Sequence, residues 1–252
     1  MQTQLGGRVA VVTGSGRNIG RAIALELASA GAAVMVNART SAAEAEAVAN
    51  EIRKAGGRAA VKIADITDPM AAAALIAAAV ESFGRLDILV NNASVRRETD
   101  FANLDYREWR EILAITLDGA YLCSHAALPH LIASGSGAIV SIGGLTAHTG
   151  SAKRAHVAAA KAGLVGLTRA LAHDLAPHGI TVNCVAPGFI DTLRLASSTS
   201  GGDPAHHRVQ APLVRRRGKP EEIAALVHFL CGPDARYITG QTIHANGGIF
   251  MG

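Results

Sequence analysis

Val9-Ala10-Val11-Val12-Thr13-Gly14-Ser15-Gly16-Arg17-Asn18-Ile19-Gly20-Arg21-Ala22-Ile23-Ala24-Leu25 predicts a strand, a tight turn and a helix in succession. The first four residues are an unbroken apolar run, which is typical of a parallel strand buried on both faces. Gly14, Gly16 and Gly20 allow the backbone to turn sharply and to approach a ligand closely. Because a helix start presents free N–H groups and the positive end of a dipole, this turn favours a phosphate ligand.

The length and composition indicate one globular domain. The chain has 252 residues, 49% of them hydrophobic, and no Pro/Ser-rich linker divides it, so we expect one domain over residues 1–252. The longest apolar run, residues 70–80, is shorter than the about 20 residues that a membrane span needs. The first residues show no basic segment followed by an apolar core, which predicts a cytoplasmic protein.

Charge and cysteine content exclude several kinds of site. The net charge of +4 is modest and the basic residues are dispersed along most of the chain, so nucleic-acid binding is not predicted. Cys123, Cys184 and Cys231 lie far apart and are odd in number. We therefore expect neither a metal site nor a disulfide framework, and a reducing compartment.

Strand and helix patterns alternate along the chain. Strands are predicted at 9–12, 33–36, 59–64, 138–141, 180–185 and 237–248, with a further one in segment 86–94, and helices at 41–56, 69–83, 105–134, 155–175 and 220–230. This alternation predicts a Rossmann-like α/β fold, a doubly wound parallel sheet with helices on both faces. Residues 193–212 read as a loop, with 197–202 a mobile tip over the active site.

The end of the second strand indicates which dinucleotide the protein prefers. NAD-selective folds place a carboxylate there to accept hydrogen bonds from the adenosine ribose. This chain has Asn37-Ala38-Arg39 instead, and Arg17 lies in the glycine-rich turn. Two cations could bind a 2′-phosphate through charge-assisted hydrogen bonds, so we predict NADP(H).

Several motifs together resemble the short-chain dehydrogenase/reductase family. The turn resembles the family's T-G-x-x-x-G-x-G pattern at Thr13, Gly14, Ile19 and Gly20, with Asn18 in place of the middle glycine. Further matches are Asn91-Asn92-Ala93-Ser94, where Ser94 replaces a glycine, Ala160-Lys161-Ala162-Gly163, Pro187-Gly188, and Asn246-Gly247-Gly248 near the end. The resemblance covers about residues 7–248.

The resemblance implies a nicotinamide cofactor and the residues that bind it. Asp65 would receive the adenine amino group, Asn92 and Ala93 would lie along the cofactor, and Ile190 with Thr192 would face the nicotinamide amide. The full implied set is Gly14, Ser15, Gly16, Arg17, Asn18, Ile19, Gly20, Arg39, Asp65, Ile66, Asn92, Ala93, Lys161, Pro187, Gly188, Ile190 and Thr192.

The catalytic residues of the family are mostly absent. Its chemistry uses an Asn, a Ser and a Tyr-x-x-x-Lys pair: the Tyr protonates the substrate oxyanion, the Ser polarises it, and the Lys lowers the Tyr pKa. Lys161 matches the lysine, but the Tyr position is Val157, the Ser position Gly144 and the Asn position Thr116. A general acid accelerates such a reaction roughly 10² to 10⁴-fold, so activity without the Tyr requires another proton donor.

Four nearby side chains are candidate substitutes. His156 precedes the missing Tyr, but a neighbouring helical position points about 100° away, so a packed or interface histidine is the alternative. Thr146 lies two residues beyond the Ser position, on the same side of a segment expected to be strand-like, and could supply a hydroxyl. His148 and Lys153 belong to the same loop and are interpreted as solvated.

Two functional hypotheses follow. The first is an NADP(H)-dependent oxidoreductase that acts on a small carbonyl or alcohol substrate, with Lys161 and water or a loop residue supplying the proton. The second is an NADP(H)-binding scaffold or partner subunit with little catalysis. The long helices 105–134 and 155–175 resemble the family's interface helices, so we expect a homotetramer, or a hetero-oligomer with a complete homologue.

Overall fold

The chain forms one seven-stranded parallel sheet with the strand order β3-β2-β1-β4-β5-β6-β7. The computed structural model describes residues 4–193 and 211–252. The strands are β1 (Val9–Val12), β2 (Ala33–Ala38), β3 (Arg58–Ile63), β4 (Ile88–Asn91), β5 (Ala138–Ile142), β6 (Thr181–Pro187) and β7 (Thr242–Ala245). The order reverses direction between β1 and β4, which is where doubly wound sheets bind their ligands.

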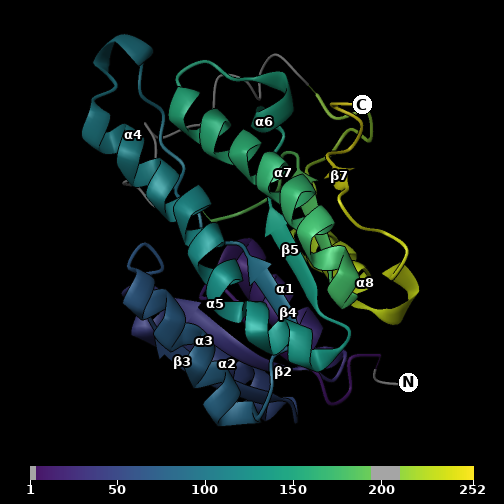
Figure 1. Cartoon of the computed structure of the whole chain (residues 1–252). Coiled ribbons are helices and arrows are strands. Elements are labelled where there is room, and N and C mark those ends of the chain that lie inside the picture. Colours follow the sequence, from purple (N-terminus) through teal and green to yellow (C-terminus); the bar gives the residue numbers. More distant parts are fainter. Residues whose placement is uncertain (1–3, 194–210) are drawn as a thin grey trace.

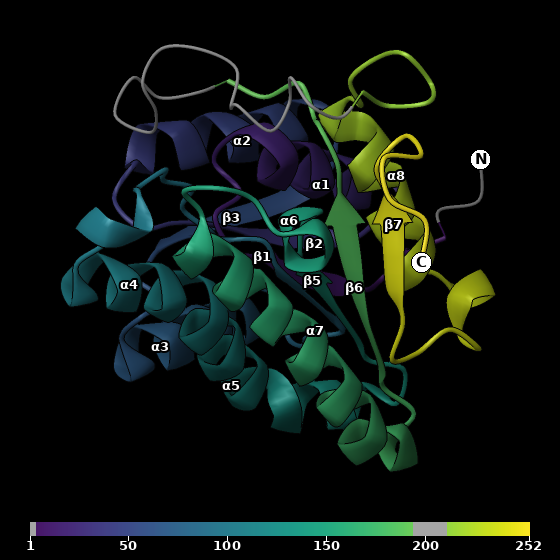
Figure 2. The same cartoon turned by 90° about the horizontal axis from the view of Figure 1, so that it is seen from above.

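Helices cover both faces of this sheet (Figures 1 and 2). One face carries α1 (Asn18–Ser29), α2 (Ala42–Lys54) and α8 (Pro220–Cys231), and the other carries α3 (Pro69–Phe83), α4 (Tyr106–Leu113), α5 (Gly119–Ser134) and α7 (Ala155–Leu175). The single turn α6 (Thr146–Thr149) follows β5. The predicted doubly wound α/β fold is confirmed.

Local sequence explains why α3 begins and ends where predicted. At the start of α3, the Asp68 carboxylate accepts hydrogen bonds from the N–H groups of Met70 (2.7 Å) and Ala71 (3.2 Å), and Pro69 occupies the first turn. Gly84 then ends the helix in the left-handed conformation at φ 86°.

Two hydrophobic cores lie on opposite faces of the sheet. Alternate strand residues face each side, so Val12 and Val34 pack under α1 and α8, whereas Val11 and Met35 pack under α3 and α5. Strands β1 and β2 are buried along their whole length. The unbroken apolar run at residues 9–12 therefore reflects burial on both faces.

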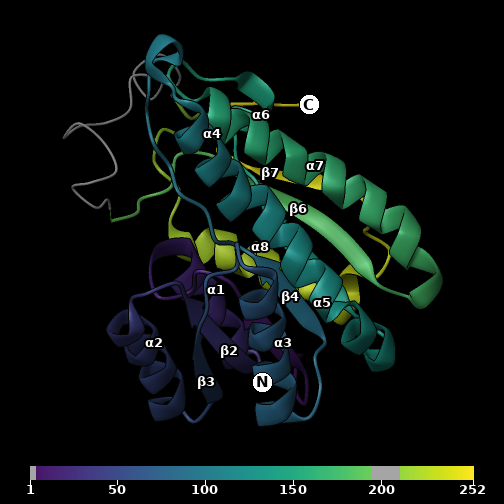
Figure 3. The ribbon, with the colours of Figure 1, turned by 60° about the vertical axis from the view of Figure 1, so that its left-hand side comes forward.

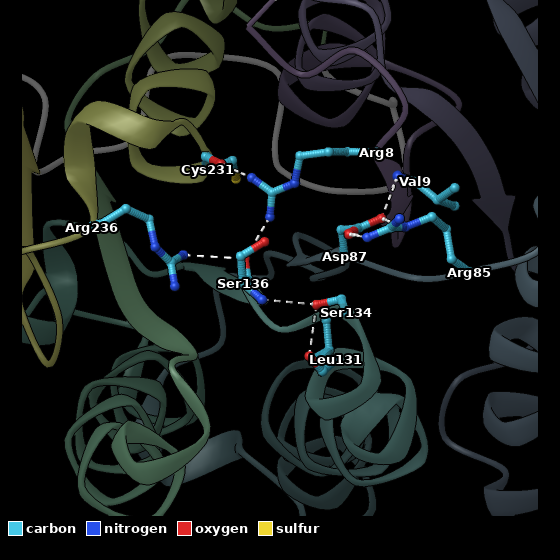
Figure 4. A network of polar contacts seen from close by, with 9 residues as sticks. All are labelled: Arg8, Val9, Arg85, Asp87, Leu131, Ser134, Ser136, Cys231 and Arg236. Atoms are coloured by element: carbon cyan, nitrogen blue, oxygen red, sulfur yellow. Dashed lines mark hydrogen bonds and ion pairs between the residues drawn. The ribbon is translucent and has the colours of Figure 1, made fainter.

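A polar network closes the amino edge of the sheet, opposite the glycine-rich turn (Figure 4). The guanidinium group of Arg8, which precedes β1, donates to the carbonyl oxygens of Cys231 (2.5 Å) and Ser136 (2.7 Å). The fully buried Asp87, which precedes β4, accepts from the Val9 N–H (2.9 Å) and from Arg85. These contacts fix the starts of β1, β4 and β5. They lie at the edge opposite to the carboxyl ends of the strands, where doubly wound sheets bind their ligands.

The predicted helix over 105–134 is interrupted by a π-turn. Helix α4 runs into a π-helical turn at Ala114–Asp118, and α5 continues to Ser134 (Figure 3). By length and hydropathy this Tyr106–Ser134 rod could cross a membrane. In the fold, however, it is a core helix, because Cys123, Ala127 and Leu131 are fully buried against the sheet.

Candidate functional site

A cleft of about 330 Å³ lies at the carboxyl edge of the sheet, where the strand order reverses. Its glycine-loop end is bordered by the turn after β1, the end of β2 and the end of β3. Its lysine end surrounds Lys161. The residues that line the lysine end include Ser94, Val95, Arg96, Ile115, Ile142, Gly144, Leu145, Thr146, Arg154 and Val157. A cleft of this size fits a small-molecule or cofactor site.

The glycine-rich turn is locked to strand β4. The Thr13 hydroxyl oxygen accepts hydrogen bonds from the N–H groups of Asn92 and Ala93, both at 3.0 Å. The Asn92 amide donates in return to the carbonyls of Thr13 (2.8 Å) and Gly14 (3.0 Å). The turn is therefore rigid before any ligand arrives.

Two glycines are required by close approach of the backbone. A Cβ on Gly20 would come within 2.4 Å of the Gly14 carbonyl oxygen and 2.5 Å of the Asn92 amide nitrogen. Gly14 has a φ of +60°, and its Cβ would lie 3.0 Å from the Cα of Ala93. Asn18, at the position of the missing glycine, adopts a φ of +52°, which asparagine tolerates better than most residues.

The glycine-loop end contains two arginines and, besides the predicted Asp65, one carboxylate that the sequence analysis did not predict. Arg39, which directly follows β2, is exposed, and it lines this end of the cleft together with Arg17. Glu44, in the first turn of α2, also lines the cleft, and its carboxylate is 3.9 Å from the Arg17 guanidinium. Both side chains of this pair are 45% exposed, so water screens the interaction and the pair contributes little.

The structure brings the predicted cofactor residues together, with two exceptions. All of them line the cleft except Ser15 and Thr192. The Ser15 side chain is buried behind the turn, where its hydroxyl donates to the Val12 carbonyl at 2.7 Å. The residue after Thr192 is held by the turn instead: Asn18 donates to the Leu193 carbonyl (3.0 Å) and accepts from its N–H (2.9 Å).

Lys161 is the buried cation of the site. It is 7% exposed, and its Nζ donates to the Ile142 carbonyl oxygen at 2.5 Å. Burial lowers the pKa of Lys161 from its usual range to about 8, while the nearby Cys184 thiol opposes that change and the Arg96 charge adds to it. With a pKa of about 8, Lys161 is suited to donate a proton near neutral pH.

The sequence analysis predicts Val157, Gly144 and Thr116 at the family's Tyr, Ser and Asn positions. Val157 lies one turn before Lys161 on α7, is 3% exposed, and packs with Ile112 and Ala160. A Cβ on Gly144 would meet nothing within 4 Å, so the space of a serine side chain is open. Thr116 lies in the π-turn, and its hydroxyl is 3.2 Å from that of Ser94. Two of the predicted departures from the family pattern, Ser94 and Thr116, thus contact each other.

The proposed substitutes differ in their relation to the cleft. His156 is fully buried, its Nε2 lies 3.1 Å from the Glu108 carboxylate, and it does not line the cleft. The packed interpretation of His156 therefore holds. His148 packs edge to face on His244, and Lys153 pairs with Asp100 at 3.2 Å, both outside the cleft lining.

Thr146 does line the cleft, but the geometry expected for its segment is wrong. The sequence reading treated residues after β5 as strand-like, whereas α6 is a helical turn. The turn forms because the Leu145 carbonyl accepts from the N–H groups of His148 (2.9 Å) and Thr149 (3.1 Å). The predicted tip at 197–202 lies outside the described residues.

Three polar residues that line the lysine end were not among the predicted site residues: Ser94, Arg96 and Arg154. Ser94 and Arg96 follow the Asn-Asn-Ala motif directly, so their nearness to that motif was the available signal. Arg154 precedes α7 by one residue and is 6% exposed. Its burial depends on a partner distant in sequence, Glu98, which the local pattern does not reveal.

Comparison with known proteins gives consistent matches over nearly the whole chain. The model of the family described as "Enoyl-(Acyl carrier protein) reductase" matches residues 14–250. The 3-oxoacyl-[acyl-carrier-protein] reductase FabG of Staphylococcus aureus is 40% identical, with 96% of this chain and 98% of the relative covered. The short-chain reductase protein NovJ of Streptomyces niveus is 41% identical, with 95% of this chain and 93% of the relative covered.

A solved structure agrees with the fold. A short chain dehydrogenase from Burkholderia cenocepacia, determined in complex with NADP, superposes with a TM-score of 0.90. It is 39% identical, and the match covers 98% of this chain and 99% of that chain.

Proposed function

Since the chain belongs to the short-chain dehydrogenase/reductase family of oxidoreductases, we propose that it uses NADP(H) to interconvert a small carbonyl compound and its alcohol through an altered active site. The observation that carries this proposal is one continuous cleft that joins a preformed phosphate-binding turn to the buried Lys161. We further propose that residues 1–252 form a single domain of this type.

The residues of the glycine-loop end suit NADP(H). The N-terminus of α1 and the rigid turn before it would hold the pyrophosphate, since no N-cap side chain hydrogen-bonds to the first N–H groups of this helix and its dipole end is positive. Arg17 and Arg39 would bind the 2′-phosphate, and Asp65 would lie near the adenine. The complex of the Burkholderia relative with NADP supports this choice.

NADPH, when bound, supplies the hydride, and the protein must supply the proton. An ammonium group has three N–H donors, and the Ile142 carbonyl takes one from Lys161. The remaining donors can stabilise a substrate oxyanion and, directly or through water, protonate it. The hydroxyls of Ser94 and Thr146 also line this end and are available to polarise the carbonyl.

If Lys161 is the proton source, the reaction has a defined pH dependence. The group donates only while protonated, and its pKa is about 8, so we expect turnover to be constant below that pH and to fall as the pH rises through about 8. Ketone reduction by saturating NADPH, followed between pH 6 and 10, measures this. Lys161→Met is expected to remove the pH-dependent rate, and a profile that stays flat through pH 8 to 9.5 would contradict the role.

The second candidate function is an NADP(H)-binding scaffold or partner subunit. It is favoured by the filled position of the missing Tyr, since Val157 is packed with Ile112 and Ala160 and has no proton to give. NADPH binding followed by fluorescence, beside turnover on a ketone panel, separates the two candidates. Binding with no turnover of any ketone would favour the scaffold.

We propose that the protein assembles as a homotetramer or with a complete homologue. Ala158 and Ala159 are partly buried, while Ala162 and Gly166 are exposed on α7, and these small residues allow a partner helix to approach closely. Light scattering at micromolar concentration is expected to give a mass of at least a dimer. A monomer at that concentration would remove this proposal.

A further inference from the structure

The lysine end of the cleft holds a primary amine in buried, largely apolar surroundings. Lys161 lines the cleft, is 7% exposed, and donates from Nζ to the carbonyl oxygen of Ile142, which lines the cleft as well. Apolar side chains border the same end: Val95, Ile115, Leu145 and Val157. Because water solvates an amine in such a place poorly, burial favours its neutral form over the ammonium ion.

No carboxylate at this end of the cleft favours the ammonium form. Within residues 4–193 and 211–252, the carboxylates that line the cleft are Glu44 and Asp65, and both belong to the glycine-loop end. The acidic group near Lys161 is the thiol of Cys184, and burial raises the pKa of that thiol to about 11. Cys184 is therefore neutral near pH 8 and provides no counter-ion.

The amine, and not the thiol, is the nucleophile that a molecule in the cleft can reach. Cys184 is fully buried and does not line the cleft, whereas Lys161 does. Burial lowers the pKa of Lys161 to about 8, so about a quarter of this amine is neutral at pH 7.5, against about 0.1% for an ordinary lysine of pKa about 10.4. A desolvated lysine of this kind attacks carbonyl carbon.

The surroundings of Lys161 leave room for an adduct. A Cβ on Gly144, which lines the same end, would meet nothing within 4 Å. Val157, one helical turn before Lys161 on α7, has no polar atom in its side chain that would compete for Nζ. The cleft of about 330 Å³ is large enough for a small molecule.

We propose that Lys161 is a nucleophile that binds small, mainly apolar aldehydes covalently, through an imine between its Nζ and the carbonyl carbon. This activity goes beyond the proposed reduction, because it requires no nicotinamide and uses the neutral amine instead of the ammonium ion. It makes Lys161 a covalent modification site of the cleft.

The reaction balances with water as the other product. The lone pair of the neutral Nζ forms a bond to the carbonyl carbon, the nitrogen loses a proton to solvent, and the carbonyl oxygen takes one up to give a carbinolamine. The carbinolamine then loses its hydroxyl group and the second nitrogen-bound proton as water, which leaves a carbon–nitrogen double bond. Neither an oxidant nor a reductant is consumed, and hydrolysis reverses the reaction.

Reductive trapping tests the proposal on the natural protein without NADPH. The protein is mixed with butanal and sodium cyanoborohydride at pH 7.5, and samples are taken at short times. Cyanoborohydride supplies a hydride that, with one proton from solvent, converts an imine into a stable secondary amine. Mass spectrometric peptide mapping then gives the rate of butylation at each of the five lysines of the chain, Lys54, Lys62, Lys153, Lys161 and Lys219.

We expect Lys161 to be butylated at least about tenfold faster than each other lysine, since a far larger share of it is neutral. In the chain unfolded by guanidinium chloride, all five lysines are expected to react at similar rates. This comparison needs no variant, so it remains decisive even if substitution of the buried Lys161 impairs folding.

The pH dependence provides a second measurement. The ratio of the Lys161 rate to the Lys153 rate cancels the effect of pH on cyanoborohydride itself. Because the neutral amine is the reacting form, this ratio is expected to be constant below about pH 8 and to fall above it by up to about tenfold per pH unit, as Lys161 becomes fully neutral while an exposed lysine continues to lose its proton.

Variants assign the fast reaction to one side chain. Lys161→Arg keeps a positive charge but cannot form an imine, so it is expected to abolish the fast butylation and to leave the slow reaction at the other four lysines. Lys153→Arg is the matched control, because the Lys153 side chain is 52% exposed, pairs with Asp100 at 3.2 Å and does not line the cleft. It is expected to leave the Lys161 rate unchanged.

Two results would overturn the proposal: a Lys161 rate in the folded protein no greater than that of the exposed lysines, or an equally fast butylation that persists in Lys161→Arg. Fast butylation of Lys161 in a protein that reduces no ketone with NADPH would support the imine site and remove the proposed reduction. Ketone reduction with an unreactive Lys161 would do the reverse, so the two failures are distinguishable.

Discussion

The double variant Gly144→Ser/Val157→Tyr is expected to reduce a simple reactive ketone at least about tenfold faster than the natural protein, a barrier lower by about 1.4 kcal/mol. It supplies a proton donor and a polarising hydroxyl at the positions predicted for the family's Tyr and Ser, and these groups contribute roughly 10² to 10⁴ and 10² to 10³ in rate, respectively. Lys161 lies one helical turn after position 157, which is the offset that lets it lower the pKa of a phenol there.

The structure leaves more space for a side chain at position 144 than for a larger side chain at position 157. A serine at 144 meets no atom within 4 Å of its Cβ. A tyrosine at 157 must direct its ring along the cleft wall, because Val157 is 3% exposed and packs on Ile112 behind it. Gly144→Ser alone is the control, and it is expected to give a smaller increase.

Turnover at saturating NADPH across a pH series measures the outcome. A new ionisation that depends on Tyr at 157 would identify the restored acid. Unchanged turnover with intact NADPH binding would show that the surroundings of Val157 have been remodelled, and it would favour the scaffold function.

The second large effect concerns cofactor choice. Arg39→Asp is expected to weaken NADPH binding by about 1.5 to 3 kcal/mol, or roughly 10- to 150-fold, and to spare NADH. Arg39 is exposed at the end of β2 in the cleft, where a 2′-phosphate would lie between it and Arg17. Fluorescence titration of both nucleotides measures the change.

Glu44 supplies a matched control for this experiment. Its carboxylate is 3.9 Å from the Arg17 guanidinium and lines the same end of the cleft. Glu44→Gln is therefore expected to leave NADH binding unchanged and to strengthen NADPH binding slightly. A natural protein that binds NADH more tightly than NADPH would show that the two arginines do not set the preference.

Much of the fold could be predicted because local signals were strong. Helices α3 and α7 begin and end where the sequence reading placed them, and β1 has its predicted bounds. Each signal is local: an apolar run for β1, and Asp68, Pro69 and Gly84 for the ends of α3. The π-turn at Ala114–Asp118 carries no such signal, since its apolar residues fit a continuous α-helix equally well.

The candidate site was predictable only in part. The family resemblance indicated Lys161, Val157 and Asp65, and the end of the second strand indicated Arg39. The contact of Ser94 with Thr116 joins two segments far apart in the sequence. The burial of Arg154 likewise depends on Glu98, which is far from it in the sequence, so only the folded arrangement shows this pair.

Deuterium transfer most directly tests whether this chain is an oxidoreductase despite Val157 and Gly144. The protein is incubated in excess over a panel of charged and uncharged ketones with NADPH that carries deuterium at C4 of the nicotinamide, and products are analysed by mass spectrometry after a single turnover. We expect deuterium at the carbinol carbon of at least one product, in amounts that Lys161→Met strongly reduces. Full binding of NADPH without deuterium in any product would contradict the proposed catalysis.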